Sequence, residues 1–464
     1  MNPLTGGLRF LLTTLFNSLV ALVFFLVAGH FASPSFVGEV AIIQLVETIT
    51  ISFFSVLPFQ LVTREVAHYY ASSQDYTKVI YTTLSYSLLI SPFLLFLLFF
   101  PSYLWLSIPY FVLFLYSSYQ FQLLSGLGKF TEASVGNAVF TIARWGLSVV
   151  AIFYHSIELL ILIWTMGALV KAIYYQRFLP FKLYIDKGLL METVRTGFPI
   201  YLYGAILFVS FQGDRAMTAF LLGSYDLGIY QLVALAAMVP SMIIYSFSNS
   251  LIPSSTYYYV KGRDIREMSS MTFRVVSLIS LPTAILSYAV SPLFISKLFP
   301  EYVSGIESMQ LLVLFLTATM PLQLLSTFMI ATKVSYRPFI LIGSLSAVEV
   351  ISLSYLLIPV LGILGAALAQ VVNALLTSAL YLVFSVKQKI FPLGRREAFT
   401  LLLTALSFLS LLNWVVALIT VLLGFRFLGV VSASEAKAVE GLIPQSLRRF
   451  VKILYLIVRD QSTY

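Results

Sequence analysis

The chain of 464 residues contains no cysteine, and charged side chains make up only 10% of it. Without cysteine there are no disulfides, no thiolate metal sites and no cysteine nucleophile. The three histidines, His30, His68 and His155, are scattered, as expected of residues at a membrane interface. No glycine-rich phosphate loop of the Walker type is present, which argues against ATP hydrolysis.

Apolar residues are abundant, at 59% of the sequence, with a mean hydropathy of +0.95. Apolar runs repeatedly reach the ~20 residues that a helix needs to span hydrocarbon. The loops between them are too short to form a water-soluble core of their own. The pattern therefore predicts an all-α polytopic membrane protein with about 14 transmembrane helices, at 9–30, 37–60, 80–100, 103–125, 132–154, 157–178, 198–221, 227–252, 271–291, 308–331, 338–358, 362–386, 398–412 and 413–431.

Basic residues fix the expected orientation. With the N terminus inside, all but three of the 28 Lys and Arg residues fall on the cytoplasmic loops and termini. The exceptions are Lys297 on an outer loop and two arginines inside helices, Arg144 and Arg215. Both termini are therefore predicted to be cytoplasmic. The net charge of +9 is explained by topology and anionic lipid headgroups, without nucleic acid.

A faint internal repeat divides the chain. Gly38, before the second predicted helix, corresponds to Gly228, before the eighth, and Asp75 corresponds in the same way to Asp264. The spacing predicts two six-helix lobes related by a pseudo-two-fold axis along the membrane normal. The expected organisation is a first lobe at 1–178, a cytoplasmic linker at 179–197, a second lobe at 198–390, two further helices within 391–432 and an amphipathic cytoplasmic tail at 433–464.

Five ionisable residues lie at mid-membrane depth: Glu47, Arg144, Asp214, Arg215 and Glu349. A charge there costs at least ~2.5 to 3.5 kcal/mol, so each must face a partner or a water-filled cavity. Arg144 and Glu349 occupy nearly equivalent places in the two halves, and either pair with each other or serve separate walls. Neighbours on a helix point ~100° apart, so one of Asp214 and Arg215 faces a cavity and the other a neighbouring helix.

Uncharged polar residues within the predicted helices form a second set. Gln212 and Gly213 directly precede Asp214. The rest either line the same path or serve as hydrogen-bonding glue between helices, and they are Asn17, Gln44, Gln231, Gln370 and Asn373.

The stretch from Gly197 to Arg274 resembles the start of the C-terminal lobe in polysaccharide flippases of the Wzx type. These belong to the MOP (multidrug, oligosaccharidyl-lipid, polysaccharide) exporter superfamily. The similar residues are Gly197-Phe-Pro199, Asp214-Arg215, Gly223 with Leu227-Gly-Ile-Tyr230, Lys261-Gly-Arg-Asp264 and Leu298-Phe-Pro-Glu-Tyr302. The resemblance extends over nearly the whole chain in topology, including two extra C-terminal helices.

The resemblance implies a V-shaped pair of lobes around a central cavity, and a polyprenyl-linked glycan moved from the inner to the outer leaflet. It implies that Arg215 and Arg144 bind the phosphate, with Gln212, Asn17 and Gln231 beside them, while Asp214, Glu47 and Glu349 hold a coupling H⁺ or Na⁺. No other cofactor and no metal are expected. The first helix has no basic residue in its middle, so any family pattern that places a phosphate-binding arginine there is not met.

The family further implies a monomer in a prokaryotic plasma membrane that works with membrane lipids and with glycosyltransferases of the same pathway. Two other functions compete with the flippase. One is an H⁺- or Na⁺-coupled multidrug or metabolite antiporter of the same superfamily. The other is a membrane-embedded glycosyltransferase or polymerase, which the short outer loops disfavour, since the longest, at about 292–307, holds only Lys297, Glu301 and Glu307.

Overall fold

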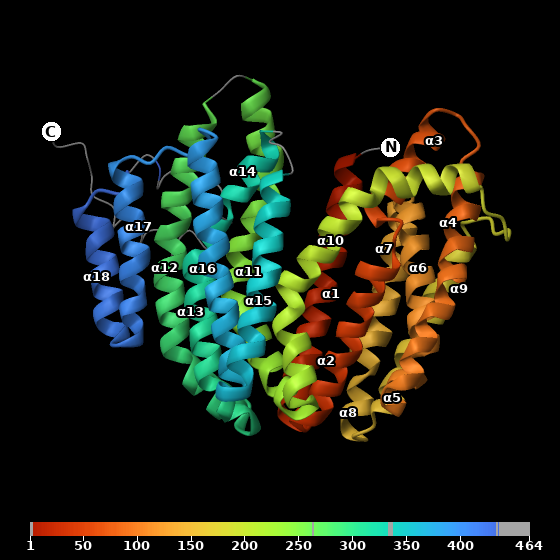
Figure 1. Cartoon of the computed structure of the whole chain (residues 1–464), viewed down its shortest axis with the longest axis horizontal. Coiled ribbons are helices and arrows are strands. Elements are labelled where there is room, and N and C mark those ends of the chain that lie inside the picture. Colours follow the sequence, from red (N-terminus) through yellow and green to blue (C-terminus); the bar gives the residue numbers. More distant parts are fainter. Residues whose placement is uncertain (1–2, 262–263, 333–336, 433–434, 436–464) are drawn as a thin grey trace. The chain divides into compact units, whose positions relative to one another are not determined.

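The computed structural model describes residues 3–261, 264–332, 337–432 and 435. Every regular element in these ranges is a helix (Figure 1). In chain order they are α1 (Pro3–Phe31), α2 (Pro34–Ile49), η1 (Thr50–Phe54), α3 (Phe59–Ala71), α4 (Thr77–Ile90), η2 (Ser91–Phe99), α5 (Ser102–Leu106), α6 (Ile108–Gly126), α7 (Phe130–Thr141), η3 (Ile142–Leu147), α8 (Val149–Phe153), α9 (Ile157–Gln176), α10 (Lys187–Leu222), α11 (Ser224–Val260), α12 (Ile265–Leu298), η4 (Pro300–Gly305), α13 (Ile306–Gln323), α14 (Leu325–Ala331), α15 (Arg337–Leu361), α16 (Ile363–Lys387), α17 (Arg395–Ser407), η5 (Phe408–Leu411) and α18 (Trp414–Phe427).

The predicted fold class is confirmed. Each of the fourteen predicted spans corresponds to one helix or to a run of consecutive helical segments. Within the described ranges, nine helical segments are long and apolar enough to cross a membrane, and two shorter apolar helices accompany them. The chain is a multi-pass membrane protein. The predicted amphipathic tail at 433–464 lies outside the described residues except for Glu435.

Several predicted spans consist of consecutive helical segments, and in two of them one segment is a π-helix. The span predicted at 37–60 leaves α2 through η1 and stops at Phe54, because the following backbone breaks before Pro58, which begins α3 as its N-cap. The span predicted at 132–154 passes through η3, which contains Arg144. Single π-helical turns inside α-helices are rare and are frequent at functional sites.

Two compact units make up the chain. The N-terminal unit contains the residues up to Gln212 together with Gly223–Gly228. In it α6 packs against α9, α3 and α4, and α7 packs against α1 and α9. Its core includes Leu84, Leu115, Tyr119 and Tyr175, all of which are almost fully buried. The lobe boundaries predicted from the sequence, at residues 178 and 198, stay predictions.

The helix predicted to begin at residue 198 begins eleven residues earlier, at Lys187, so part of the predicted linker is helical. Asp186 caps the start of α10 because its carboxylate accepts a hydrogen bond from the backbone N–H of Leu189 at 3.1 Å. The residues before it are tied to α4, where the hydroxyl of Thr82 accepts from the N–H of Asp186 and the hydroxyl of Ser85 from that of Tyr184. The predicted linker is therefore a docked segment.

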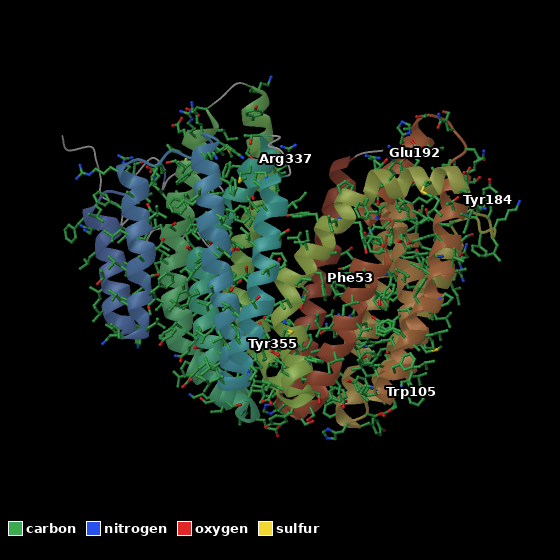
Figure 2. All side chains as sticks on the ribbon, viewed as in Figure 1. Phe53, Trp105, Tyr184, Glu192, Arg337 and Tyr355 are labelled. Carbon is green, nitrogen blue, oxygen red and sulfur yellow. The ribbon has the colours of Figure 1, made fainter. Side chains whose placement is uncertain are left out.

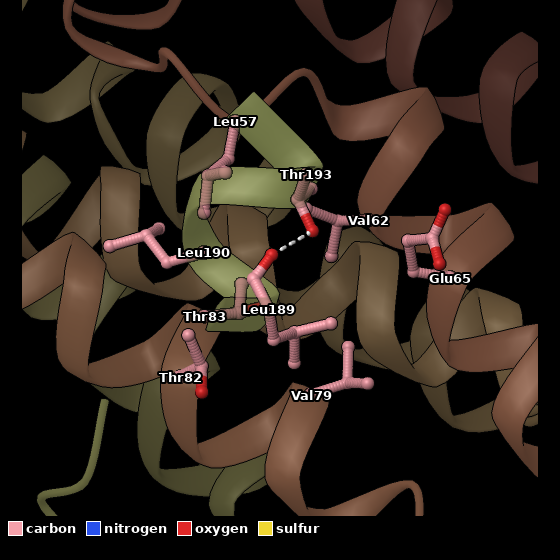
Figure 3. Close-up of a pocket in the computed structure, with 9 residues that line it drawn as sticks. All are labelled: Leu57, Val62, Glu65, Val79, Thr82, Thr83, Leu189, Leu190 and Thr193. Atoms are coloured by element: carbon pink, nitrogen blue, oxygen red, sulfur yellow. Dashed lines mark hydrogen bonds between the residues drawn. The ribbon is translucent and has the colours of Figure 1, made fainter. Parts of the chain in front are cut away.

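A small cavity lies beneath this docked segment (Figure 3). Leu189, Leu190 and Thr193 from α10 close it over Val79 and the α4 threonines. Its volume is about 250 Å³, and its lining is mostly apolar. A cavity of this size and lining does not accommodate an oligosaccharide headgroup.

Aromatic residues mark both ends of the N-terminal unit (Figure 2). Tyr184 and Glu192 lie near one end, and Trp105 lies at the opposite end. The Tyr184 and Trp105 side chains are 41% and 46% exposed. Tyr and Trp are enriched at the two membrane interfaces, so this spacing is typical of a unit that crosses a bilayer.

The C-terminal unit contains Gly213–Leu222 and the chain from Ile229 onward. Here α12 packs against α13, α13 against α16, and α15 against α16. The two extra helices, α17 and α18, pack against each other and against α12. A shared core joins them to the unit, in which Leu403, Ala417 and Phe425 meet Leu278 and Leu281.

Candidate functional site

Four ionisable side chains from four different helical segments meet inside the N-terminal unit. They are Glu47 from α2, Tyr110 from α6, Arg144 from η3 and Lys171 from α9, and together they are called the N-terminal polar cluster. Glu47 is 8% exposed, Tyr110 0% and Lys171 3%. Charged side chains that are buried inside membrane helices must be paired or hydrogen-bonded, because hydrocarbon offers no compensation.

Arg144 and Glu47 form a bidentate ion pair. The two terminal guanidinium nitrogens of Arg144 donate to Glu47 Oε1 at 3.0 Å and to Oε2 at 2.7 Å. The Tyr110 hydroxyl donates to the same Oε2 at 2.6 Å. Arg144 therefore has an ion-pair partner within the N-terminal unit, and the alternative in which it pairs with Glu349 stays a prediction. Parallel bonds of this kind are among the strongest that a carboxylate makes.

Aromatic rings surround the Arg144 guanidinium. Its central carbon lies 4.6 Å from the ring centroids of both Trp145 and Trp164, which favours a cation–π interaction with each. The Trp164 indole N–H also donates to the backbone carbonyl of Arg144 at 2.7 Å and lies 3.0 Å from the Ser148 hydroxyl oxygen. Arg144 in η3 is thus fixed both through its side chain, by the two rings, and through its backbone carbonyl, by the Trp164 indole.

Lys171, like Tyr110, is a member of the cluster that the sequence did not identify. It was assigned to a cytoplasmic loop, yet it lies inside α9 and is buried. Its ammonium lies 3.4 Å from Asn137 Oδ1, a long contact, and 4.8 Å from the Phe140 ring centroid. The signal was available, because Lys171 stands seven residues before the predicted end of its span, roughly 10 Å along a helix.

Asp214 lies inside the C-terminal unit, on α10. It is 3% exposed, and its Oδ2 accepts a hydrogen bond from the Tyr230 hydroxyl of α11 at 2.5 Å. The other carboxylate oxygen, Oδ1, is buried without a hydrogen-bond partner among the residues that the structure describes. One oxygen is therefore fixed, and the other keeps its capacity to bind a proton or a cation.

Arg215 is also buried, at 6% exposure. One of its terminal nitrogens lies 4.0 Å from the sulfur of Met238 on α11. Neither Asp214 nor Arg215 is exposed to lipid, as expected of functional charges in a membrane helix. Gln212 is half-buried one turn earlier, and Gln231 is buried next to Tyr230.

Gly213 brings α10 close to α15. A Cβ atom at this position would lie 3.0 Å from Val350 and 3.2 Å from Ile351, so the absence of a side chain permits the approach. Glu349 directly precedes Val350. Both carboxylate oxygens of Glu349 are buried without a hydrogen-bond partner in the described part of the chain. Glu349 therefore lies on the stretch of α15 that faces the Asp214 region.

The remaining predicted polar residues differ in their surroundings. Asn373 accepts a hydrogen bond from the Ser346 hydroxyl at 2.6 Å and donates to Gln370 at 3.3 Å, so this group joins α15 to α16 as interhelical glue. Asn17 on α1 is half-buried, and its Oδ1 has no hydrogen-bond partner among the described residues. Asn17 thus retains an unused acceptor in the N-terminal unit.

A second ion cluster forms around Arg274, which the sequence assigned to a loop but which lies within α12. Arg274 is 7% exposed and forms ion pairs with Glu397 of α17 and with Glu435. Ser270 donates to the same Glu397 oxygen. Both carboxylates belong to the C-terminal unit, so this cluster fastens the extra helices to α12 rather than forming a substrate site.

Buried charged side chains inside long apolar helices are typical of polytopic transporters. Comparison with solved structures shows which fold the chain has. The chain is similar to the inward-facing conformation of a multidrug resistance MATE family transporter of the MOP superfamily, with a TM-score of 0.67, 13% identity and coverage of 81% of this chain and 94% of that chain.

It is equally similar to the lipid II flippase MurJ in its inward closed conformation, with a TM-score of 0.67, 14% identity and coverage of 89% and 96% of the two chains. An outward-facing MATE transporter matches with a TM-score of 0.55 at 13% identity, covering 84% and 96%. No curated protein sequence matches the chain. The family model of polysaccharide biosynthesis proteins matches residues 4–258, more than half of the sequence, and the chain belongs to this family. The predicted resemblance is thus confirmed by the family model and, in fold, by the transporter and flippase structures.

Proposed function

We propose that this protein is an alternating-access flippase that moves a polyprenyl-(pyro)phosphate-linked oligosaccharide from the inner to the outer leaflet, for surface polysaccharide or glycoprotein synthesis. The observation that carries the proposal is the burial of two adjacent charged residues, Asp214 and Arg215, in the second half of α10, in a chain of the polysaccharide biosynthesis family. Both residues lie within the part that the family model matches.

Arg215 suits the phosphate of a lipid-linked sugar. A guanidinium forms charge-assisted, bidentate hydrogen bonds with phosphate oxygens and stays protonated at any physiological pH. We assign the phosphate-binding role to Arg215, with Gln212, Gln231 and Asn17 contributing polar contacts to the headgroup.

The N-terminal unit offers two cations for the transport machinery, Arg144 and Lys171. Glu47 already neutralises the charge of Arg144 through two hydrogen bonds, so a phosphate would have to compete with a carboxylate for this guanidinium. Lys171 has three donor hydrogens and a single long hydrogen-bond contact, to Asn137. We therefore place Lys171, rather than Arg144, as the second cation of the transport machinery.

The coupling ion is expected at carboxylates with unused oxygens. Asp214 Oδ1 and both oxygens of Glu349 meet this condition among the described residues, whereas both oxygens of Glu47 are bonded. Binding of H⁺ or Na⁺ at Asp214 or Glu349 removes an uncompensated buried charge, which supplies the driving force for uptake. We assign coupling to these two residues and a pairing role to Glu47.

The same proposal includes the cellular setting. We infer from the basic loops that both termini lie in the cytoplasm, and we propose that the protein acts as a monomer in the plasma membrane of a prokaryotic cell. Glycosyltransferases that build the lipid-linked glycan on the cytoplasmic side supply its cargo. The solved lipid II flippase of the same fold supports a cargo of this chemistry.

A cell that lacks the gene tests the proposal. Lipid-linked oligosaccharide is expected to accumulate in the inner leaflet, and the native chain is expected to restore its appearance at the cell surface. The Arg215→Gln variant is expected to fail at comparable protein levels. Arg64→Gln is the matched control, because the Arg64 side chain is 60% exposed and pairs only with neighbouring Glu65 among the described residues. Unchanged surface glycan in the deletion strain contradicts the proposal.

A second function is favoured by one observation, since the MATE transporter matches with the same TM-score of 0.67 as the flippase. That alternative is an H⁺- or Na⁺-coupled antiporter of drugs or metabolites. Export of small cations that persists in cells unable to make lipid-linked sugars supports it. Loss of surface glycan without a change in drug resistance supports the flippase.

A further inference from the structure

The first turns of α2 and α11 touch backbone to backbone. A Cβ atom added to Gly38 would lie 1.7 Å from the carbonyl oxygen of Ser224, and one added to Gly228 would lie 1.8 Å from the carbonyl oxygen of Pro34. Real Cβ atoms essentially never come within 3.0 Å of another atom. Any side chain at either glycine therefore separates the two helices by more than an ångström.

The two contacts are reciprocal. Pro34 and Ser224 begin α2 and α11, and each glycine stands four residues later in its own helix. Pro34 corresponds to Ser224 and Gly38 to Gly228 in the internal repeat, at the same sequence offset. Each contact is therefore the symmetry image of the other, which a chance crossing of two helices does not produce.

The contact lies beside a capped helix start and a glycine turn, and buried side chains flank it. The Ser33 hydroxyl caps α2 by accepting from the N–H of Phe36, and Gly223, with φ of +86°, turns the chain into α11. Val37 and Leu227 flank the glycines at equivalent repeat positions and are 1% and 0% exposed. The contact lies inside one compact unit, because Gly223–Gly228 is grouped with the N-terminal unit although the rest of α11 is not.

The forces across the contact suit repeated opening. Backbone contacts of this type rest on van der Waals packing and weak Cα–H···O interactions, without interlocking side chains or ion pairs. The segments just before the two helices, Ala32–Ser33 and Gly223, carry no basic residue, so the proposed orientation puts the contact at the outer face of the membrane. A flippase that releases its headgroup outward has to open this face.

We propose that Gly38 and Gly228 form an outer gate, shut in this structure, whose two backbones part to release the cargo headgroup and close again without a side chain in the way. This inference rests on the proposed flippase function. It assigns a role to two residues that bind neither phosphate nor coupling ion. It also explains why the repeat keeps glycine at both equivalent positions of this chain.

A cysteine reporter tests the gate directly, since the native chain contains no cysteine. Leu227→Cys places a thiol at a position that is 0% exposed beside the contact, and a membrane-impermeant maleimide applied from outside measures its accessibility. Adding Gly38→Ala is expected to raise the labelling rate on the order of tenfold, because the methyl group shifts the population toward the open gate. Gly204→Ala is the matched control, because a Cβ atom there meets nothing within 4 Å.

Equal labelling rates in the reporter with and without Gly38→Ala overturn the gate, provided that the variant melts at the native temperature. A second experiment leaves both glycines intact and so covers the case in which Gly38→Ala does not fold. Ser35→Cys combined with Tyr225→Cys places thiols at equivalent positions on the two sides of the contact. Oxidative cross-linking of this pair is expected to abolish translocation, and reduction is expected to restore it.

Full translocation by the cross-linked protein overturns the gate as well. The maleimide assay requires no cargo, so it distinguishes the two proposals. Altered labelling without movement of lipid-linked sugar preserves the gate and removes the assigned cargo. Movement of lipid-linked sugar with unaltered labelling preserves the cargo and removes the gate.

Discussion

Arg144 and Glu47 are joined by two parallel hydrogen bonds, of 3.0 and 2.7 Å, deep inside the N-terminal unit. Glu47 neutralises the positive charge of Arg144, a residue that the sequence analysis proposes for phosphate binding. The buried cations that the proposal uses are Lys171 in the N-terminal unit and Arg215 in the C-terminal unit. The pair therefore decides which residues carry the transport chemistry.

The first prediction concerns this pair. Glu47→Ala leaves the Arg144 guanidinium buried and unpaired, so the free energy of unfolding is expected to fall by about 3 to 5 kcal/mol. Unfolding of the purified protein in detergent measures the loss. Glu65→Ala is the control, because Glu65 belongs to an exposed pair with Arg64. A Glu47→Ala protein as stable as the control is incompatible with the pair.

Charge reversal separates the two possible partners of Arg144. The double variant Glu47→Arg with Arg144→Glu is expected to recover part of the stability that either reversal loses, because the attraction is restored with the sign exchanged. Arg144→Glu with Glu349→Arg is expected to recover nothing. Recovery only in the second combination means that Arg144 pairs with Glu349 in the membrane.

A third prediction tests Lys171. Lys171→Met removes the buried ammonium and keeps the length of the side chain, so the melting temperature is expected to stay equal or to rise. Translocation is expected to fall by about tenfold or more, because the second cation is lost. Transport assays on vesicles at matched protein levels measure it. Native transport rates in Lys171→Met show that the lysine only fills space.

Tyr230→Phe is the fourth change. It deletes the 2.5 Å hydrogen bond from the Tyr230 hydroxyl to Asp214 and leaves the ring in place. A hydrogen bond to a charged group contributes about 1.5 to 3 kcal/mol, and a loss of that size is expected in thermal unfolding. The dependence of transport on pH or Na⁺ is expected to shift, since Asp214 loses its fixed partner. An unshifted ion dependence removes Asp214 from the coupling site.

The fifth prediction addresses the extra helices. Arg274→Met leaves the carboxylates of Glu397 and Glu435 without their shared cation, so α17 and α18 are expected to loosen from α12. Hydrogen exchange of the α17 amides is expected to accelerate. Arg395→Met serves as the control, because Arg395 contacts only the Phe399 ring of its own helix among the described residues. Equal protection of α17 in both variants contradicts the assignment.

Much of the fold follows from the sequence alone. Long apolar runs fix where helices cross the membrane, and loop charges fix their expected orientation, because both are one-dimensional signals. The ends of the helices are harder to predict from the sequence. The start of α10 at Lys187 depends on capping by Asp186 and on hydrogen bonds from α4, which involve residues about a hundred positions away.

The sequence predicts only part of the candidate site. The sequence identifies Asp214, Arg215 and Glu47 as buried charges, because their depth is read directly from the helix. It does not identify the partner of Arg144, since partner choice depends on which helices pack together. Lys171 was lost for a different reason. The count of basic residues by loop assigns every lysine near a helix end to the interface, whereas α9 turns this one inward between rings.

The most direct test of the central claim uses purified protein in vesicles that contain a fluorescent polyprenyl-pyrophosphate-linked oligosaccharide. A lectin or a membrane-impermeant quencher, added outside, counts the sugars that reach the outer leaflet. The native chain is expected to move the lipid, and the variant with Asp214→Asn and Arg215→Gln is expected to move none while remaining folded. Equal movement by that variant, or no movement by the native chain when an ion gradient is present, contradicts the account.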